Sequence, residues 1–480
     1  MEEIKIRNFL EIPYEELEEQ NLRAKEKVCQ HTPDHQLCEH YLKYLSDEKQ
    51  LKAVSICFAD LEGRFHLLDY DKKFLVKSHD NLTFDGSSVN GFAELRESDL
   101  RLAIDWGSFR WLPSDVFGPG KVLAFGLIRG IDGSPYGSDM RGQLKELTDE
   151  LHSKESITAN VACEIEGFLF EGLQAEQNYH PDAKFDLVTS GGYFHSLPGS
   201  TLRKFIDKFA EAQRALGFEN EKDHPEVAPS QFELNYSYTD ALIAADQIQL
   251  YKLLARQIAA TMGCTASFLP KPLTGLNGNG MHTNISLSKD DKNTFFEEGG
   301  EENLSEVAWD FVDRLLLNAN DLCLVTNPSV NAYRRLDPNY EAPNQIKASA
   351  VDRSSMVRIP AGNKNSARIE MRSVAPDANP YMLLYCLLRI GREGPKPEAL
   401  TSDNRRTRTR FLPDNIYDAM RLFKQSSTMS ELLGSDNHQK YWQAKKDSAD
   451  RCPKELGTTV KACEILYHHE VTNQLLWSQF

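Results

Sequence analysis

Strict alternation of apolar and acidic residues in one short segment constrains this chain more than any other feature. Residues 161–168 read Val-Ala-Cys-Glu-Ile-Glu-Gly-Phe. In a β-strand every second side chain points to the same face, so the valine, cysteine and isoleucine face a core while Glu164 and Glu166 lie side by side opposite. Two carboxylates this close repel each other unless a cation lies between them. The segment predicts a strand whose acidic face is either a solvated surface or a metal site.

Two further acidic residues, Glu226 and Glu233, lie just before and within a second alternating strand. Residues 231–236 place Gln231 and Glu233 on one polar face, with aromatic and aliphatic side chains behind them. Pro229 cannot donate to a strand ladder, so we expect a turn or bulge between Glu226 and this strand.

Arginines gather around a third alternating segment. Residues 367–372 place Arg368, Glu370 and Arg372 on one face. Other arginines occur at four nearby positions in the sequence, Arg334, Arg335, Arg353 and Arg358. Guanidinium groups bind phosphate and carboxylate groups bidentately. The pattern indicates either a site for such groups or a structural ion-pair network.

A glycine-rich run ends in a histidine at residues 271–284, which read Lys-Pro-Leu-Thr-Gly-Leu-Asn-Gly-Asn-Gly-Met-His-Thr-Asn. Glycine lets the backbone approach a ligand closely, and His282 can act as a metal ligand or a charge partner. Apolar flanks predict a loop that leads into a strand. Alone, such a loop is either a plain turn or a ligand site.

Taken together, these segments offer five carboxylates and one imidazole. Hard carboxylate oxygens with a single imidazole favour Mg²⁺ or Mn²⁺ over zinc. Arginines beside two such metal ions are typical of sites that catalyse phosphoryl transfer. The candidate metal ligands are Glu164, Glu166, Glu226, Glu233, His282 and Glu370.

Charge and hydropathy exclude several classes of protein. The formal net charge of −16 disfavours nucleic-acid binding, which needs a basic surface. No window approaches the ~18 apolar residues of a membrane span, and the charged N-terminus lacks a signal core, so we expect a cytoplasmic protein. The nine scattered cysteines are typical of reduced thiols. Cysteines and histidines at positions 29–40 lack zinc-site spacing, which favours a solvated helix face over a metal site.

Helical and strand-like patterns are mixed along the chain without regular βαβ spacing, which favours an α+β fold. Residues 1–50 have a helical composition, and Ala53–Leu68 predicts a hairpin with a turn at Glu62 and Gly63. The loop cluster at 132–138 is the best candidate for a domain boundary, giving domains 1–138 and 139–480.

Several motifs, in order, resemble the bacterial-type (type I) glutamine synthetase family. The resemblance covers about residues 53–480. Its most specific motifs are Phe-Asp-Gly-Ser-Ser at 84–88, Glu-Ile-Glu at 164–166, Glu-Val-Ala-Pro-Ser-Gln-Phe-Glu at 226–233, Asn-Gly-Asn-Gly-Met-His at 277–282, Asn-Ala-Tyr-Arg-Arg-Leu-Asp-Pro at 331–338 and Arg-Ile-Glu-Met-Arg at 368–372.

The resemblance implies a role for each of these residues. One Mg²⁺ or Mn²⁺ is held by Glu166, Glu226 and Glu233, and the other by Glu164, His282 and Glu370. The implied contacts to ATP are Ser286, Arg353, Arg358 and Lys364. The implied contacts to L-glutamate are Asn277, Gly278 and Arg335, with Arg372 beside the phosphate that is transferred. Glu341 belongs to a flap over the site. Asp85 reaches the site from the neighbouring subunit and binds ammonium there.

The family fold implies a small N-terminal β-grasp domain and a larger catalytic domain with a curved antiparallel sheet backed by helices. The implied assembly is a homo-oligomer, a dodecamer of two stacked hexamers, with active sites between subunits. The implied reaction is glutamine synthesis for nitrogen metabolism. ATP phosphorylates the side-chain carboxylate of glutamate, and ammonia then displaces phosphate from the acyl phosphate.

Two rival functions stay open. A γ-glutamyl-amine ligase would use an alkylamine or polyamine in place of ammonia, but such relatives tend to lose the Asp-Gly-Ser-Ser loop that is intact at 85–88. A non-catalytic homologue would tend to lose metal ligands, and all six positions are filled here. One departure from the family is Arg334, where most members have lysine.

Overall fold

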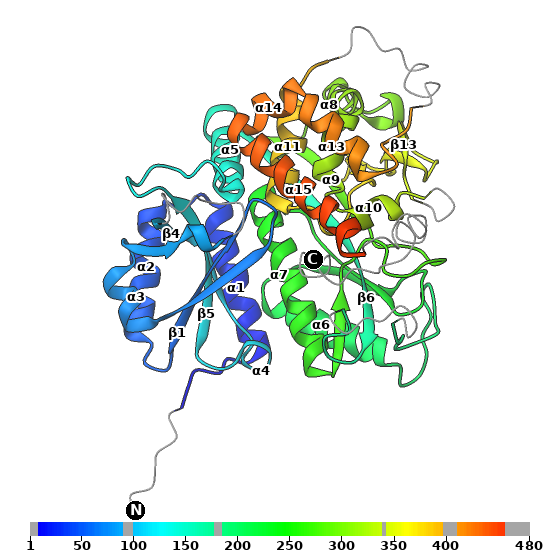
Figure 1. Cartoon of the computed structure of the whole chain (residues 1–480). Helices are drawn as coiled ribbons and strands as arrows, with labels where there is room; N and C mark the ends of the chain where they lie inside the picture. Colours follow the sequence, from blue (N-terminus) through cyan, green and yellow to red (C-terminus); the bar gives the residue numbers. More distant parts are fainter. Residues whose placement is uncertain (1–7, 90–98, 177–184, 338–341, 397–409, 457–480) are drawn as a thin grey trace, which may run out of the picture.

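The computed structural model describes residues 8–89, 99–176, 185–337, 342–396 and 410–456. Two sheets organise these residues, and helices cover them (Figure 1). The N-terminal elements are α1 (Tyr14–Cys29), α2 (Asp34–Asp47), β1 (Ala53–Ala59), β2 (Phe65–Asp71), α3 (Lys72–Ser78), β3 (Leu82–Asp85), β4 (Asp99–Trp111), α4 (Ser114–Phe117) and β5 (Lys121–Arg129).

The first sheet has five strands in the order β2-β1-β5-β4-β3. β1 runs parallel to β5, and the remaining neighbours are antiparallel. The predicted hairpin is confirmed as β1 and β2. Its turn needs Gly63, which has a φ of +88° and comes so close to Asn379, just before α11 (Pro380–Glu393), that a Cβ would lie 2.7 Å from it.

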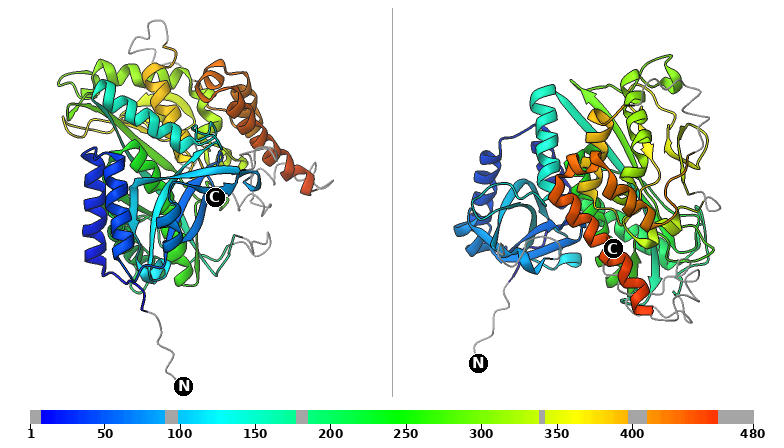
Figure 2. Two further views of the ribbon diagram at one scale, coloured as in Figure 1. Left: turned by 90° about the vertical axis from the view of Figure 1, so that its left-hand side faces the viewer. Right: turned by 45° about the horizontal axis from the view of Figure 1, so that its top comes forward.

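Both faces of the first sheet are covered, because β1 and β5 carry buried apolar residues on both of their faces. Val54 and Ile56 pack with α1 and α2, whereas Cys57 and Phe125 belong to the core of the larger part of the chain. The two parts therefore share buried surface. Figure 2 shows the two N-terminal helices side by side on the outside of this sheet.

The second part carries a ten-stranded sheet that curls around the site, and its main path runs β13-β14-β15-β11-β6-β8-β7. It is antiparallel except between β13 and β14. The strands are β6 (Ile157–Glu171), β7 (Asn220–Pro225), β8 (Gln231–Tyr236), β9 (Thr239–Asp240), β10 (Cys264–Ser267), β11 (Met281–Lys289), β12 (Lys292–Asn293), β13 (Gln345–Ser349), β14 (Ser355–Arg358) and β15 (Ile369–Met371).

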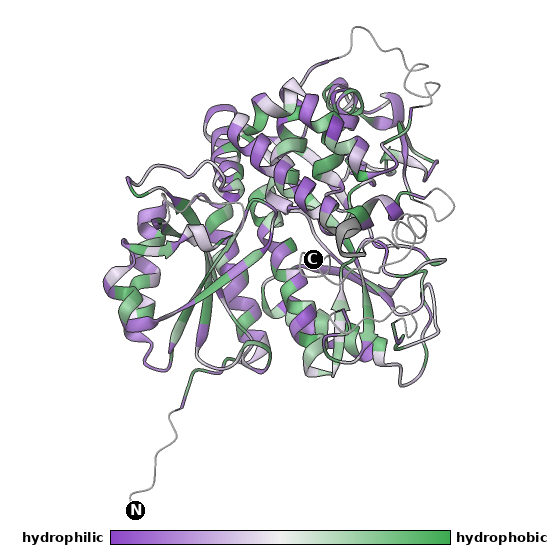
Figure 3. Cartoon of the chain, in the orientation of Figure 1, coloured by the Kyte–Doolittle hydropathy of each residue, from purple (hydrophilic) through white to green (hydrophobic). Residues whose placement is uncertain are grey.

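Helices cover the apolar face of this sheet, and Figure 3 shows hydrophilic and hydrophobic residues alternating along helices such as α6 and α15. The helices are α5 (Met140–Glu155), α6 (Thr201–Ala215), α7 (Ala241–Thr261), α8 (Glu306–Leu317), α9 (Ala319–Thr326), α10 (Val330–Arg335), α11 (Pro380–Glu393), α13 (Ile416–Gln425), α14 (Ser427–Leu433) and α15 (Ser435–Leu456). The α+β class with a curved sheet is confirmed.

The predicted face of β6 is also confirmed. Val161, Cys163 and Ile165 are at most 2% exposed and lie in the core with α5 and α7. Glu164 and Glu166 therefore point to the opposite, concave face.

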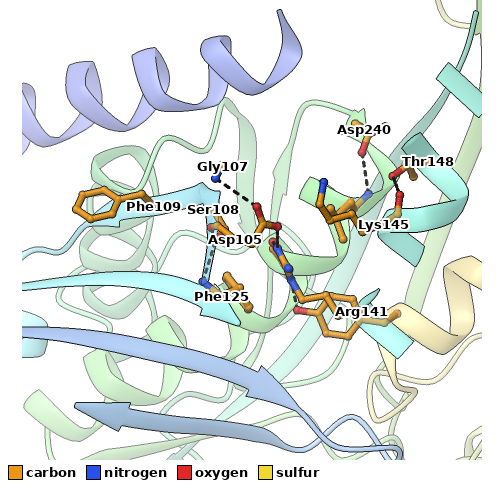
Figure 4. A network of polar contacts seen from close by, with 12 residues as sticks. Asp105, Gly107, Ser108, Phe109, Phe125, Arg141, Lys145, Thr148 and Asp240 are labelled. Carbon is orange, nitrogen blue, oxygen red and sulfur yellow. Dashed lines mark hydrogen bonds and ion pairs between the residues drawn. The ribbon is translucent and has the colours of Figure 1, made fainter. Parts of the chain in front are cut away.

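A buried ionic network joins β4 of the first part to α5, α7 and α11 of the second, near the proposed boundary at 138. Arg141 at the start of α5 donates to Asp105 of β4 at 2.8 Å (Figure 4). It also donates to both carboxylate oxygens of Asp246 on α7. Tyr381 of α11 donates to the same Asp246 at 2.8 Å. Arg141 is 2% exposed, so its charge depends on these partners.

Candidate active site

A cavity of about 450 Å³ opens on the concave, polar face of the second sheet. It forms where β6, β8 and β11 bring their polar faces together with the glycine-rich loop. The predicted residues that line it are Glu164, Glu166, Glu226, Glu233, Asn277, Gly278, His282, Arg335, Arg353, Arg358 and Arg372. Segments spread over 209 positions of sequence thus meet in one pocket, which we call the acidic pocket.

The first cluster joins Glu164 and His282, which line this pocket, with the fully buried Glu370, and the ligand atoms of the three lie within 4.8 Å of one another. Strand register explains it, since His282 pairs with Glu164 and Asn284 pairs with Glu370. His282 Nδ1 lies 3.5 Å from Glu164 Oε2 and 3.7 Å from Glu370 Oε1. Burial alone would raise the pKa of Glu164, but the hydrogen bond and charge of His282 outweigh it and lower this pKa to about 2.

The second cluster joins Glu226 and Glu233 with His224, again within 4.8 Å. Burial and the nearby charge of Glu166 raise the pKa of Glu226 to about 8, and the same two causes raise that of Glu233. Carboxylates crowded in this way favour a cation between them. Within the described residues, the buried Nε2 of His224 has no hydrogen-bond partner. A metal ion fits both observations.

Glu166 stands opposite Glu233 in the sheet, but its side chain also holds the glycine-rich loop. Its Oε2 accepts from the backbone N–H of Gly280 at 2.7 Å. Gln231 Nε2 donates to the carbonyl of Gly278 at 3.0 Å. The predicted loop before a strand is confirmed, and two polar groups from β6 and β8 fix its shape.

Close packing explains the glycines of this loop. A Cβ on Gly278 would lie 2.3 Å from the carbonyl oxygen of Pro270, and a Cβ on Gly280 would lie 2.6 Å from Arg335 Nη2. Arg335 is 5% exposed beneath the loop and donates to the carbonyl of Arg372 at 2.9 Å. Burial lowers its pKa to about 10, which leaves it charged at neutral pH.

Arginines oppose the acids, as the alternation at 367–372 predicted. Arg358 Nη1 lies 2.8 Å from Glu370 Oε2, and Arg372 Nη1 lies 2.6 Å from Glu370 Oε1. Glu370 itself is fully buried. The arginines can therefore serve both as a structural ion-pair network and as a site for phosphate or carboxylate groups. The ion pairs with Glu370 hold their guanidinium groups at the wall of the acidic pocket.

Ser286 and Lys364 line a different cavity from the acidic pocket. This outer cavity has a volume of about 760 Å³. A third cavity of about 300 Å³ lies between the two, since it shares Glu164 and Arg368 with the acidic pocket and Ser286 and Tyr238 with the outer cavity. The three cavities adjoin one another along the sheet, and we call this row of cavities the channel.

Asp85 does not line the acidic pocket of its own chain. It ends β3 and accepts hydrogen bonds from the hydroxyls of Ser87 at 2.6 Å and Ser88 at 2.7 Å. These bonds hold the pKa of Asp85 below its usual range. The residues just before this loop form β3, in which Leu82 pairs with Leu102 of β4. Glu341 lies outside the described residues.

Sequence reasoning missed His224 and Tyr238. His224 precedes the Glu226 motif by two positions, and this spacing on β7 was the signal that could have identified it. Tyr238 follows β8 and is 58% exposed along the channel. An exposed aromatic ring after a polar strand carries no specific sequence signal.

Comparison with known proteins identifies the family. Residues 137–462 match the family described as glutamine synthetase, catalytic domain. The chain belongs to the glutamine synthetase family. The Clostridium saccharobutylicum glutamine synthetase is 36% identical over 418 residues, which cover 83% of this chain and 91% of that protein. The Staphylococcus aureus glutamine synthetase is 35% identical over 427 residues, which cover 84% and 93%.

Solved structures share the fold of this glutamine synthetase family member. A Plasmodium falciparum glutamine synthetase superposes with a TM-score of 0.77 at 19% identity, covering 88% of this chain and 98% of its own. A GmaS/ADP complex superposes with a TM-score of 0.75 at 24% identity, covering 88% and 99%. At these identities the likeness extends to the fold alone.

Proposed function

We propose that this chain joins ammonia to the side-chain carboxylate of L-glutamate through a γ-glutamyl phosphate intermediate, giving glutamine, ADP and phosphate. Family membership makes it an ATP-dependent ligase that forms glutamine. The observation that supports the detailed mechanism best is the meeting of two acid–imidazole clusters and several arginines in one pocket.

Members of this family use divalent metal ions, and the residues present fit two of them. We assign one Mg²⁺ or Mn²⁺ to Glu164, His282 and Glu370. We assign the second to Glu226 and Glu233, with Glu166 and His224 beside it. When bound, such ions would neutralise phosphate charge and polarise the oxygens of the phosphoryl group that is transferred.

The arginines would stabilise the charge that develops during phosphoryl transfer. Arg358 and Arg372 are held at the pocket wall by Glu370, so they need little reorganisation when charge forms. Arg353 lines the same pocket. Its guanidinium would spread the charge of the phosphate between ATP and glutamate.

Glutamate would bind where Asn277 and Gly278 line the pocket above Arg335. The guanidinium of Arg335 suits the carboxylates of this substrate, and its Nη1 has no hydrogen-bond partner within the described residues. ATP would extend from the acidic pocket into the channel, with its nucleoside near Ser286 and Lys364.

Ammonium would be held by Asp85 of a neighbouring subunit, because an ionised carboxylate attracts the cation and can accept its proton. Asp85 does not line the acidic pocket of its own chain, which agrees with a site between subunits. We accordingly propose a homo-oligomer, and a dodecamer as its form. We also expect it in the cytoplasm. None of the described helices is long and apolar enough to span a membrane.

The test is phosphate release by purified protein supplied with ATP, Mg²⁺, glutamate and ammonium, each omitted in turn. Phosphate release should need all four. Glu166→Gln should reduce it by at least about 100-fold while the oligomer stays intact on gel filtration. Glu171→Gln, on the exposed end of the same strand, is the matched control. Loss of the oligomer in Glu166→Gln would instead mean that this carboxylate is structural.

A further inference from the structure

Helix α1 belongs to the N-terminal extension that the family resemblance leaves unexplained, and it is firmly docked. Its Asn21 is fully buried and donates to the carbonyls of Trp111 at 3.0 Å and Ala215 at 2.7 Å. The backbone N–H of Trp111 donates back to Asn21 Oδ1 at 3.0 Å. One side chain thus ties α1 to β4 and to the end of α6. Gly217 leaves room for this contact, since its Cβ would lie 3.0 Å from Asn21.

The C-terminal end of α1 faces the outer cavity of the channel. Lys25, Val28 and Cys29 of α1 line this cavity together with His31 in the turn that follows. Lys25 Nζ is paired with Glu219 Oε2 at 2.6 Å, which fixes this side of the wall. Residues of β6, β11 and the segment with Lys364 also line this cavity.

Two imidazole rings stack on each other where the end of α1 meets α5. His31 and His152 stack with ring centroids 3.3 Å apart and planes inclined by 18°. His31 holds a φ of +53° because α1 ends there, with the N–H of Thr32 donating to the carbonyl of Lys27. Both rings line the outer cavity, and the exposed ring of Tyr238 also lines it. The cavity therefore offers flat aromatic surfaces of the kind that a nucleobase contacts.

We propose that α1 and the turn after it form the outer wall of the nucleotide pocket, so that the N-terminal extension contributes to nucleotide affinity through the base. This inference rests on the proposed function, because the triphosphate must occupy the acidic pocket for the nucleoside to follow the channel. His31 acts as a positioning residue at the base end and takes no part in phosphoryl transfer.

The first test uses the unmodified full-length protein. Cys29 is exposed in the outer cavity, so its alkylation by N-ethylmaleimide, followed by mass spectrometry of its peptide, reports on occupation of this end. Saturating MgATP should slow the alkylation at least about fivefold. Magnesium tripolyphosphate, which has no nucleoside, should leave it unchanged. Cys38 on α2 lines none of the three cavities and is the internal control.

A second test changes the wall itself. His31→Ala should raise the Kd for MgATP about fivefold in calorimetry, with the Kd for tripolyphosphate and the KM for glutamate unchanged. His35→Ala, an exposed histidine on α2, is the matched control. The inference is overturned if MgATP binds but does not slow the alkylation of Cys29, and His31→Ala binds MgATP with the same Kd as wild type. If MgATP does not bind at all, the proposed function fails, and the inference falls with it.

Discussion

His224 of β7 lies opposite Glu233 of β8, and its Nε2 is 3.7 Å from Glu233 Oε1. Its Nδ1 is 3.5 Å from Glu226 Oε1. The imidazole therefore stands between two carboxylates that burial and mutual repulsion make unfavourable without a cation. This arrangement places His224 in the second cluster that could hold a metal ion, beside the carboxylates that the sequence motifs indicate.

Substitution of this histidine should weaken the binding of one metal ion and leave the binding of the other unchanged. His224→Asn should raise the Kd of one Mn²⁺ at least about tenfold, because a nitrogen ligand or an orienting partner is lost. The Mn²⁺ at Glu164, His282 and Glu370 should keep its affinity, since that cluster is separate. Electron paramagnetic resonance titration with Mn²⁺ measures both. His195→Asn, at an exposed histidine, is the control; equal affinities in all three proteins would contradict the assignment.

Arg335 should govern glutamate binding more than ATP binding. Arg335→Lys keeps the charge but loses the planar guanidinium beneath Gly280. The ammonium group of lysine cannot bind a carboxylate through two parallel hydrogen bonds as a guanidinium can. The KM for glutamate should rise at least about tenfold with the KM for ATP within about twofold. Steady-state kinetics with each substrate varied in turn measures the split. Arg214→Lys, at a partly exposed arginine of α6 outside the pocket, controls for the substitution, and a parallel rise in both KM values would contradict the role.

Gly280 should be required for the geometry of the site. A Cβ there would lie 2.6 Å from Arg335 Nη2 and 2.7 Å from His282 Nε2, so Gly280→Ala must displace one of these side chains. We expect kcat/KM for glutamate to fall at least about tenfold, with less than about 2 kcal/mol lost in unfolding free energy. Gly137→Ala, where a Cβ meets nothing closer than 4.0 Å, is the control. Unchanged kinetics in Gly280→Ala would show that the loop tolerates a side chain.

Asp139 should give the stability of the chain a pH dependence of unusual sign for a carboxylate. Burial raises its pKa from 3.8 to about 6, although it accepts from the backbone N–H of Ile128 at 2.7 Å. Because the folded state holds this proton more tightly than the unfolded state, the stabilisation is complete below pH 3.8 and is lost as pH rises through 6.

The measurement compares wild type with Asp139→Asn in urea unfolding followed by circular dichroism. Between pH 7.5 and pH 5, wild type should gain about 1 kcal/mol in unfolding free energy relative to the variant. The exposed Asp207→Asn should follow wild type across this range. A wild type that loses stability relative to Asp139→Asn over the same range would contradict the raised pKa.

The strands and their faces could be predicted from the sequence because period-two alternation is a local signal. Residues 161–168 and 367–372 showed it clearly, and the polar faces of both segments line the pocket. His224 was missed because Pro225 interrupts the alternation beside it. The docking of α1 could not be predicted at all, because Asn21 is fixed by Trp111 and Ala215, which lie 90 and 194 positions away. Such long-range contacts leave no periodic pattern in the sequence.

The choice of nitrogen donor tests the account most directly. Purified protein would receive ATP, Mg²⁺ and glutamate with equal concentrations of ¹⁵N-ammonium and methylamine, and mass spectrometry would quantify the two amide products. We predict that labelled glutamine exceeds γ-glutamylmethylamide at least about tenfold, since the Asp85 loop is intact. Predominance of the methylamide, or the absence of any amide product, would contradict the assignment as a glutamate–ammonia ligase.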